Sequence, residues 1–542
     1  MKRYMAHIIR SAEIRVEQFL TAQVKDRSRR DFGGIQSEIY EAKPTIYAMS
    51  EAVSVYCNVN SRYYHSEVLH EAMNHALDFI AKAQRENGSF DYPCCNFNSA
   101  PDTSFCFKRL IAGYRVLQKY EGQEQILLEK YKTIMVRALQ ALVVGGFHTP
   151  NHRWGITAAL MQGANLVEDK EFKEKLNARA EQFLAEGIDG DAEGEYAERS
   201  TGNYNAVVNN AMMAMYEESN DFYYLGFVER NLRMMLYYFE PDDTIFTQNS
   251  TRQDQGKAVY PYQYFYQYLY MATKSEDPLF GKAAHKIIKD NMERGDMAPP
   301  CLYTIMLHKE METYNFSDYG FYESYRKFFK AAGVMRVKNE TFGYSLLKGK
   351  SAFAYLKFKD TLIYLKIGES YCDIRNFIPQ SLEVNETEYI LRATAKGWYY
   401  LPFEEKQDTS DWWKMDHSKR KLQISSELTI TVTIKELENG LSFSVKSEGL
   451  DNLPLRIEIC IPKGAILSHE AFHMRAEAGG EMVLREGYLM MQHHSQTIKI
   501  GPGYGTHEFS GHYSGEEYNE TGYTIHLNDY TPYERTFSIT CE

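Results

Sequence analysis

The 542-residue sequence lacks several features that would by themselves assign it to a class of protein. No run of 18 apolar residues occurs, so the sequence predicts no membrane-spanning helix. It has no CxxC pair, and its eight cysteines include one adjacent pair, Cys94 and Cys95. Cysteines with such spacing in a long chain favour reduced, mostly buried thiols over disulfides or a metal site, and we expect no metal.

Excess positive charge is also missing. The formal net charge is −12, so the sequence offers no basic stripe to replace phosphate counterions, and a nucleic acid is not an expected partner. An anionic substrate would need cations placed locally around it. Tryptophan is scarce, with 4 residues, whereas tyrosine is abundant, with 42. Phenol rings with a donor group suit sugars, although most of them pack at the edges of a core.

What is present is a globular composition, with 44% apolar and 25% charged residues, in a chain too long for one core. We therefore expect two or three domains. The first stretch, MKRYMAHIIRSAEIRVEQF, carries charges every three or four residues, which predicts an amphipathic helix and not a signal peptide. On this basis the expected location is cytoplasmic, without membrane association, and homo-oligomerisation stays open.

Two periodicities divide the chain near residue 335. Up to about residue 330, apolar residues recur at helical spacing in segments closed by Gly, Pro or Asn. So many consecutive helices with short links predict helical hairpins arranged in a ring or arc. The predicted helices are 3–27, 38–58, 62–84, 104–120, 124–145, 152–167, 170–187, 202–218, 221–239, 261–274 and 279–293.

The second half shows the alternation of strands. In LTITVTIKEL, Leu428, Ile430, Val432 and Ile434 fall on one face and the intervening threonines on the other, and LSFSV repeats the pattern after an ENG turn. This predicts an antiparallel β-sandwich. The expected division is a helical domain over 1–335 and a sandwich domain over 336–542.

The stretch FHTPNHRWGI, residues 147–156, places Asn151, His152, Arg153 and Trp154 side by side after a proline. Asn151 as a helix N-cap and Trp154 as the start of a buried face are ordinary roles. They leave His152 and Arg153 unexplained in a first helical turn, where backbone donors and the helix dipole favour an anion. The stretch is a candidate carboxylate clamp.

A second polar stretch, residues 189–212, reads DGDAEGEYAERSTGNYNAVVNNAM. Two glycines bracket acidic residues, GEYAERS is predicted to be extended, and Ser200 or Thr201 would cap a helix that begins near Tyr204. A lone tyrosine there is more often part of the core. Arg199 and two asparagines surround Tyr204, however, which makes it a candidate catalytic residue.

The third stretch is the loop YPCCNFNSAPDTSF, residues 92–105, which carries Asn98 and Asp102. Asp102 or Thr103 as a helix N-cap is the plainer interpretation, and a sugar-binding loop is the sharper one.

TPNHRWG, followed about fifty residues later by DAEGEYAERSTGNYN (191–205), resembles the Asn-His and tyrosine elements of heparinase II/III-like and oligoalginate-type polysaccharide lyases. The resemblance implies an incomplete (α/α) toroid joined to an antiparallel β-sandwich. It also implies a lyase that cleaves uronate-containing oligosaccharides or polysaccharides by β-elimination, without a cofactor.

The resemblance further implies individual roles. Asn151 and His152 would bind and neutralise the uronate carboxylate, and Tyr204 would protonate the leaving glycosidic oxygen and, as a second option, also act as the base. Asn98 would be an additional amide near the carboxylate. One departure is that such lyases usually have a histidine early in the β-domain, whereas residues 351–368 contain none. His417, with Trp412 or Trp413 as a sugar platform, is the candidate substitute.

These residue types suit β-elimination. Donors on the carboxylate stabilise the enolate-like state that forms when the C5 proton leaves. Arg153, Arg199 and Trp154 are further candidates for substrate binding, and a cation such as Arg199 beside Tyr204 would stabilise a phenolate base. Three alternatives stay open: a glycoside hydrolase that uses two carboxylates, an epimerase-like toroid and a non-catalytic glycan-binding protein. The carboxylates available to a hydrolase are Asp102, Asp191, Glu195 and Glu198.

Overall fold

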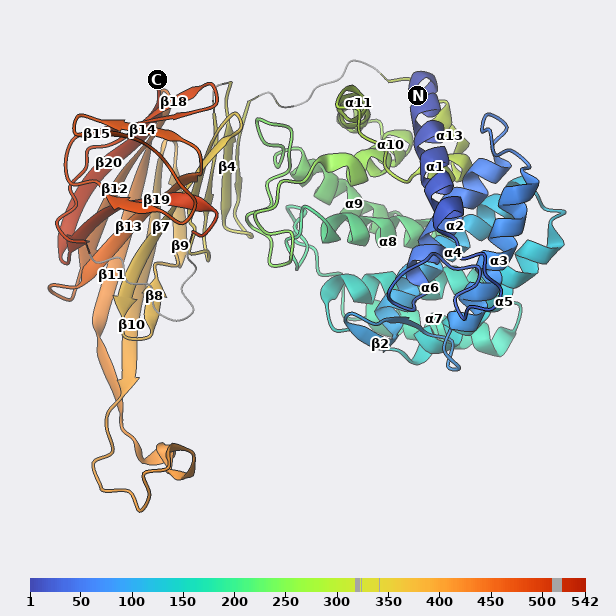
Figure 1. Cartoon of the computed structure of the whole chain (residues 1–542), viewed down its shortest axis with the longest axis horizontal. Helices are drawn as coiled ribbons and strands as arrows, with labels where there is room; N and C mark the ends of the chain where they lie inside the picture. Colours follow the sequence, from blue (N-terminus) through green and yellow to red (C-terminus); the bar gives the residue numbers. More distant parts are fainter. Residues whose placement is uncertain (317–321, 323, 341, 509–518) are drawn as a thin grey trace. The chain divides into compact units, whose positions relative to one another are not determined.

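A computed structural model describes residues 1–316, 322, 324–340, 342–508 and 519–542. The chain divides into a helical unit, Met1–Tyr238 with Thr244–Tyr322, and a strand unit, Phe239–Asp243 with Glu323–Glu542 (Figure 1). The sequence placed the change at 335/336, which falls inside strand β4 (Val334–Lys338). The short segment Phe239–Asp243 joins the strand unit because Glu240 pairs with Arg336 on β4, at 2.6 Å.

The described helices of the first unit follow the predicted periodicity closely. They are α1 (Lys2–Ala22), α2 (Lys43–Cys57), α3 (Glu67–Ala83), α4 (Ala100–Tyr120), α5 (Gln125–Val144), α6 (Pro150–Leu166), α7 (Lys170–Leu184), α8 (Tyr204–Ser219), α9 (Phe222–Met235), α10 (Phe265–Lys274), α11 (Pro278–Glu293), α12 (Leu302–Leu307) and α13 (Lys309–Glu312). A 3₁₀ turn, η1 (Pro261–Tyr264), leads into α10, and two short strands, β1 (Phe90–Tyr92) and β2 (Asn96–Ser99), precede α4.

The even-numbered helices form the inner layer of an incomplete (α/α) toroid. α2 contacts α4, α4 contacts α6 and α6 contacts α8, whereas α1, α3, α5, α7 and α9 pair with their sequence neighbours around this layer. α10 joins α8 through Gln267, whose amide donates to the Ala206 carbonyl at 2.8 Å.

The second unit is an antiparallel β-sandwich of two nine-stranded sheets. One sheet holds β9 (Ser381–Asn385), β10 (Glu388–Tyr400), β11 (Leu422–Leu437), β12 (Gly440–Glu448), β14 (Ile466–His469), β15 (Phe472–Arg475), β17 (Leu489–His493), β18 (Gln496–Gly501) and β20 (Tyr533–Cys541). The other holds β3 (Tyr325–Phe329), β4 (Val334–Lys338), β5 (Gly343–Leu347), β6 (Ala354–Phe358), β7 (Thr361–Tyr371), β8 (Ile374–Asn376), β13 (Pro454–Pro462), β16 (Glu481–Val483) and β19 (Gly522–Tyr530). Among the described strands, the β16–β19 pair is the parallel one.

The predicted alternation in this half is confirmed. Leu428, Ile430, Val432 and Ile434 are at most 1% exposed and face the core between the sheets. Each such side chain contributes roughly 1.5–3 kcal/mol of burial free energy before entropy is counted. The hairpin pairs Leu437 with Gly440 across the predicted turn. Figure 1 shows β10 and β11 running beyond the rest of their sheet to a tip that carries the 3₁₀ turns η2 (Trp412–Lys414) and η3 (His417–Lys419).

Candidate active site

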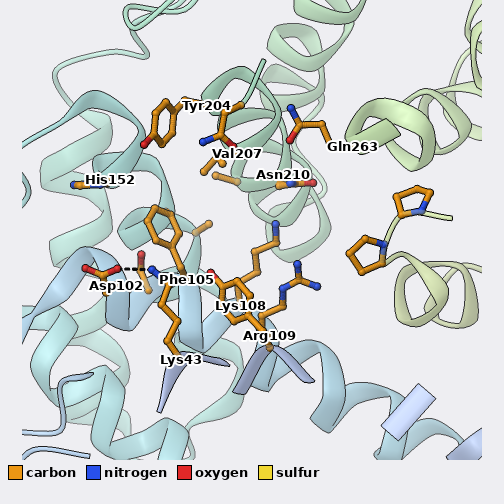
Figure 2. A pocket seen from close by; sticks show the side chains of 18 of the residues that line it. Lys43, Asp102, Phe105, Lys108, Arg109, His152, Tyr204, Val207, Asn210 and Gln263 are labelled. Atoms are coloured by element: carbon orange, nitrogen blue, oxygen red, sulfur yellow. Dashed lines mark hydrogen bonds and ion pairs between the residues drawn. The ribbon is translucent and has the colours of Figure 1, made fainter. Parts of the chain in front are cut away.

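A cavity of about 990 Å³ lies within the helical unit, and all the residues that line it belong to that unit. Its walls come from α1, α2, α4, α6, α8, α10 and α12 and from the segments around residues 92–96, 148, 202–203, 252–263 and 297–300. Figure 2 shows His152, Tyr204, Asn210 and Lys108 around this space.

The N-terminus of α6 carries the Asn-His stretch. Thr149 is the N-cap and Pro150 the first helical residue, so Asn151 lies inside the helix and is not its cap. The backbone N–H of Asn151 and its Nδ2 donate to Glu198 Oε2 at 3.0 and 2.7 Å. The anion expected at this helix start is therefore present, but it is a side chain of the protein itself. Asn151 is fully buried and does not line the cavity.

His152 lines the cavity from the same helical turn. Its ring packs edge-on against His148 at 4.6 Å and against Phe105 at 5.7 Å between centroids. Burial, and then the neighbouring His148, lowers the pKa of His152 to about 4. At neutral pH the ring is therefore uncharged, and it can donate one hydrogen bond to a ligand without contributing a positive charge.

Arg153 and Trp154 lie outside the cavity lining. Arg153 Nη2 donates to the carbonyls of Phe183 and, at 3.0 Å, Gly187, and its guanidinium lies 4.3 Å from the Trp154 ring. The Trp154 indole N–H donates to Asp189, and Trp154 is completely buried. Both residues make their contacts within the α6–α7 region, and neither lines the cavity that His152 lines.

Tyr204 is the first residue of α8 and lines the cavity. Its N–H donates to Ser200 Oγ at 3.0 Å, but the N-cap of α8 is Asn203, so neither Ser200 nor Thr201 is the cap that the sequence predicted. The phenol O–H donates to Gln253 Oε1 at 3.3 Å, and the Arg252 guanidinium lies 5.5 Å from the ring. The cation beside Tyr204 is therefore Arg252, whereas Arg199 lies outside the cavity lining.

Glu198 joins the two sequence motifs. The same carboxylate that accepts from Asn151 pairs with Arg252 Nε at 3.2 Å. Its backbone carbonyl also accepts from the Thr251 hydroxyl at 2.9 Å. Burial raises the pKa of Glu198, although the hydrogen bonds from Asn151 and the charge of Arg252 act to lower it. The chain Asn151–Glu198–Arg252 thus leads from the start of α6 to the ring of Tyr204.

In the rim loop, Asn98 and Asn96 have different surroundings. Asn98 is exposed, has a φ of 49° and lies outside the cavity lining, so the structure does not place its amide beside His152. Asn96 lines the cavity, with Nδ2 3.4 Å from Asp102 Oδ2. The N-cap of α4 is Ser99, and not Asp102 or Thr103. Asp102 instead pairs with Lys43 at 2.7 Å.

Charge around the cavity is unlike that of the whole chain. Five cationic side chains line it: Arg15, Lys43, Lys108, Arg109 and Arg252. Among the described residues that line it, Asp102 is the one carboxylate. Burial tends to raise the pKa of Asp102, but the hydrogen bonds from Lys43 and Ser99 outweigh burial and lower the pKa. The cavity therefore has a positive balance, which suits an anionic ligand.

The remaining carboxylates considered for a hydrolase do not face this space. Asp191, Glu195 and Glu198 lie outside the lining. Glu195 is 5% exposed and receives hydrogen bonds from Asn205 and Tyr238, and burial raises its pKa to about 7. The cavity thus holds no pair of carboxylates among its described lining residues.

His417 and Trp413 belong to the strand unit, at the tip of the β10–β11 hairpin. His417 Nε2 lies 2.8 Å from the Trp412 carbonyl oxygen, and Trp413 is 90% exposed. The strand unit and the helical unit are each described by themselves. The predicted part of His417 and Trp413 in substrate binding therefore stays a prediction.

Several lining residues escaped sequence reasoning. Lys43, Lys108 and Arg109 sit in ordinary helical patterns, where a cation most often faces solvent. Arg252 and Gln253 lie in the polar run NSTRQDQGK, residues 249–257, and the density of polar groups between two aromatic stretches was the available signal.

Within the described part of the chain, no group of three or more His, Cys, Asp or Glu residues has the arrangement of a metal site. None of the described helices is long and apolar enough to span a membrane. The eight cysteines are unpaired, and only Cys57, Cys106, Cys301 and Cys460 are buried. The expectation of mostly buried thiols therefore holds for half of them.

No protein-family model matches the sequence, and no curated protein matches it either. Solved structures do match the fold. A Paenibacillus xanthan lyase has a TM-score of 0.59 at 9% identity, over 99% of this chain and 57% of that one. This chain thus spans little more than half the length of that lyase. Heparinase III has a TM-score of 0.59 at 9% identity, over 98% and 85% of the two chains.

A chondroitin AC lyase of Streptomyces coelicolor A3 has a TM-score of 0.54 at 8% identity, over 100% of this chain and 80% of that one. Two of these three proteins are named as lyases, of xanthan and of chondroitin, and the match at such low identity concerns architecture. The predicted combination of an incomplete (α/α) toroid and an antiparallel β-sandwich is confirmed, and the chain has the fold of these polysaccharide lyases.

Proposed function

We propose that the protein is a polysaccharide lyase that cleaves uronate-containing oligosaccharides or polysaccharides by β-elimination in the toroid cavity. The observation that carries this proposal is the composition of the cavity wall. Tyr204 and His152 line the same space as five cationic side chains and a single carboxylate. A polar proton donor, a neutral imidazole and an excess of positive charge are what an anionic sugar requires.

The uronate carboxylate must be stabilised while the C5 proton leaves. His152 and Arg252 are the groups proposed to bind it, since both line the cavity near Tyr204. Each well-aimed donor lowers the barrier by about 3–4 kcal/mol, as donors do in oxyanion holes. Because His152 is neutral at pH 7, Arg252 is the group that places a positive charge next to the substrate carboxylate.

Tyr204 is the proposed acid. In the absence of substrate its O–H reaches Gln253. In the complex its phenol proton first passes to solvent, and the phenolate beside Arg252 takes the C5 proton of the uronate. The C5–H electron pair becomes the C4–C5 double bond, and the phenol so formed donates that proton to O4 as the C4–O4 bond breaks, so that one residue serves both transfers.

Asn151 takes a different role from the one that the sequence motif implied. Its amide donates to buried Glu198, and Glu198 pairs with Arg252. We assign Asn151 as a positioning residue that holds Glu198 and, through it, the guanidinium next to Tyr204. No observation favours the hydrolase alternative, since the described cavity wall lacks a second carboxylate.

A panel of uronate oligosaccharides tests the proposal, with chondroitin, heparan sulfate, xanthan and oligogalacturonate fragments as first members. β-Elimination creates a double bond conjugated to the carboxylate, so the expected result is a gain of ultraviolet absorbance that parallels the release of reducing ends. Reducing ends without absorbance would identify a hydrolase. Saturable binding without either signal would identify a non-catalytic glycan-binding protein, and both results contradict the proposal.

A further inference from the structure

Lys108 and Arg109 are adjacent residues of α4, and both line the main cavity. Figure 2 shows their cationic ends next to each other, below Asn210. Lys108 also lines a smaller adjoining cavity of about 80 Å³. Gln162, Asn210, Tyr266 and Tyr303 line both spaces as well, so Lys108 stands where the two cavities meet.

The other three cations of the cavity already have carboxylate partners. Lys43 pairs with Asp102 at 2.7 Å, Arg15 with Glu51 at 2.9 Å and Arg252 with Glu198 at 3.2 Å. For Lys108 and Arg109, no carboxylate of the described residues lies within 4.0 Å. These two positive charges are thus available to a ligand.

Arg109 is held in place by neutral groups. Its Nη1 donates to the Tyr303 hydroxyl at 2.6 Å, and its guanidinium lies 5.0 Å from the Tyr47 ring and 5.3 Å from the Tyr303 ring. Aromatic faces and a phenol position a guanidinium without neutralising it. The guanidinium of Arg109 therefore keeps its positive charge, and its remaining N–H groups can donate to an anion.

Burial, and next the Arg109 charge, lowers the pKa of Lys108 to about 7. An empty site of this kind is unfavourable, because both side chains are half-buried and Glu217, which acts to raise the Lys108 pKa, offsets the lowering only in part. An anion between them would restore the preference for the charged amine. The other charged or titratable groups that line the two cavities near Lys108 are Arg115, Glu217, Tyr266, Tyr303 and His308. Glu217 is already paired with His308 at 2.9 Å.

We propose that Lys108 and Arg109 form a second anion-binding subsite, which holds a sulfate or carboxylate group on a sugar next to the one that Tyr204 and His152 engage. Gln162 and Asn210 supply neutral amides at its edge. This inference rests on the proposed function for the identity of the ligand as an acidic oligosaccharide. It predicts that substrates with two anionic groups bind better than those with one.

The test compares matched ligands by isothermal titration calorimetry at pH 6, with protein carrying Tyr204→Phe so that turnover does not interfere. The ligand pairs are monosulfated and unsulfated chondroitin disaccharide, and digalacturonate with both carboxylates free and with one of the two methyl-esterified. Lys108→Met is compared with Lys173→Met, which alters an exposed lysine of α7 outside the cavity.

Loss of one charge-assisted contact corresponds to a fall in affinity of about 10-fold or more. The expected result is such a fall for the doubly anionic member of at least one pair in Lys108→Met, little change for its partner ligand, and no change in Lys173→Met. Dependence on sulfate alone or on carboxylate alone identifies which group the subsite takes. Lys108→Met protein that binds both members of both pairs as the parent does would overturn the subsite.

The variant Lys108→Arg adds a second measurement, the pH dependence of anion binding, which would not change if Lys108 were only structural. With Lys108 the preference for the second anion should weaken between pH 6 and pH 8.5, because the amine loses its proton. In Lys108→Arg the preference should persist over the same range, because a guanidinium keeps its charge. Equal pH dependence in the two proteins would contradict the subsite. These binding results are independent of the absorbance assay, so the subsite and the lyase activity can fail separately.

Discussion

At the scale of single residues, Asn151, Glu198 and Arg252 define what the Asn-His stretch does. The sequence placed Asn151 and Tyr204 in one site because of the order and spacing of two motifs. It contained no indication that Glu198 would occupy the helix start, since that contact spans 47 residues. Long-range pairing of this kind depends on packing, and local patterns do not contain it.

The two rim asparagines provide a first prediction. Asn96→Ala should lower the catalytic efficiency, because Asn96 lines the cavity and contacts Asp102. Asn98→Gly removes the other amide and suits the positive φ of that position, so it should leave the efficiency near that of the wild type. Steady-state absorbance kinetics on both variants check this. A larger loss of catalytic efficiency in Asn98→Gly than in Asn96→Ala would contradict this prediction and would indicate that Asn98 binds the substrate.

The lowered pKa of His152 predicts that the folded protein loses stability in acid. Its pKa is about 4 in the folded protein, below the usual value of 6.5, so the unfolded chain takes up the proton first as the pH falls. The corresponding stability is present above pH 6.5 and is lost between pH 6.5 and pH 4. Urea unfolding across this range should show a shallower decline for His152→Gln than for the wild type. Parallel curves would show that the His152 ring is not desolvated.

At the scale of elements, helices were predictable where an apolar stripe persists for three turns or more. The long helices α1 to α11 all correspond to predicted segments, with ends that differ by a few residues. α12 and α13 were missed because six and four residues are too short to show a period. GEYAERS was predicted as extended, but the structure has only an isolated bridge between Gly190 and Tyr196, in a chain that turns at Gly194 (φ 102°).

Glu195 lies in the same connection between α7 and α8. Its raised pKa predicts that replacing it with a neutral residue stabilises the protein. Its pKa of about 7 lies above the usual value of 4.5, so the folded protein holds the proton more tightly than the unfolded chain. The stability it contributes is present below pH 4.5 and is lost as the pH rises through 7. Glu195→Gln should therefore be more stable than the wild type at pH 8, by roughly 2–3 kcal/mol, and similar at pH 5.

Urea unfolding of the two proteins at pH 5 and pH 8 measures this difference. Glu195→Gln that is destabilised more at pH 8 than at pH 5 would mean that the carboxylate is ionised and needed in the folded state.

At the scale of the whole molecule, the sequence predicted the two architectures because helical and strand periodicities are properties of single segments. The exact division was less accessible, since Phe239–Asp243 joins the strand unit through the contact of Glu240 with Arg336. The charge of the cavity was also hidden: a chain with a net charge of −12 collects cations from α1, α2, α4 and the 249–257 run around one cavity.

This concentration of charge predicts a salt effect. The distance over which charges act in solution falls from about 10 Å at 0.1 M salt to about 3 Å at 1 M salt. Added salt therefore weakens the attraction of an anionic substrate to the cavity. KM should rise several-fold with added NaCl, while kcat changes little because contacts inside the cavity are less screened. Kinetics over a salt series, with sucrose at matched viscosity as the control, check this. A KM that stays constant would argue against recognition by charge.

The most direct test of β-elimination at this cavity compares ultraviolet absorbance gain in the wild type, Tyr204→Phe and Tyr223→Phe on a uronate oligosaccharide that the wild type cleaves. Tyr223 is an exposed tyrosine of α9 outside the cavity and serves as the matched control. Loss of the acid should reduce the rate about 10²–10⁴-fold in Tyr204→Phe, with binding retained, and Tyr223→Phe should match the wild type. A full rate of absorbance gain in Tyr204→Phe would contradict the assignment of this tyrosine and of the cavity it lines.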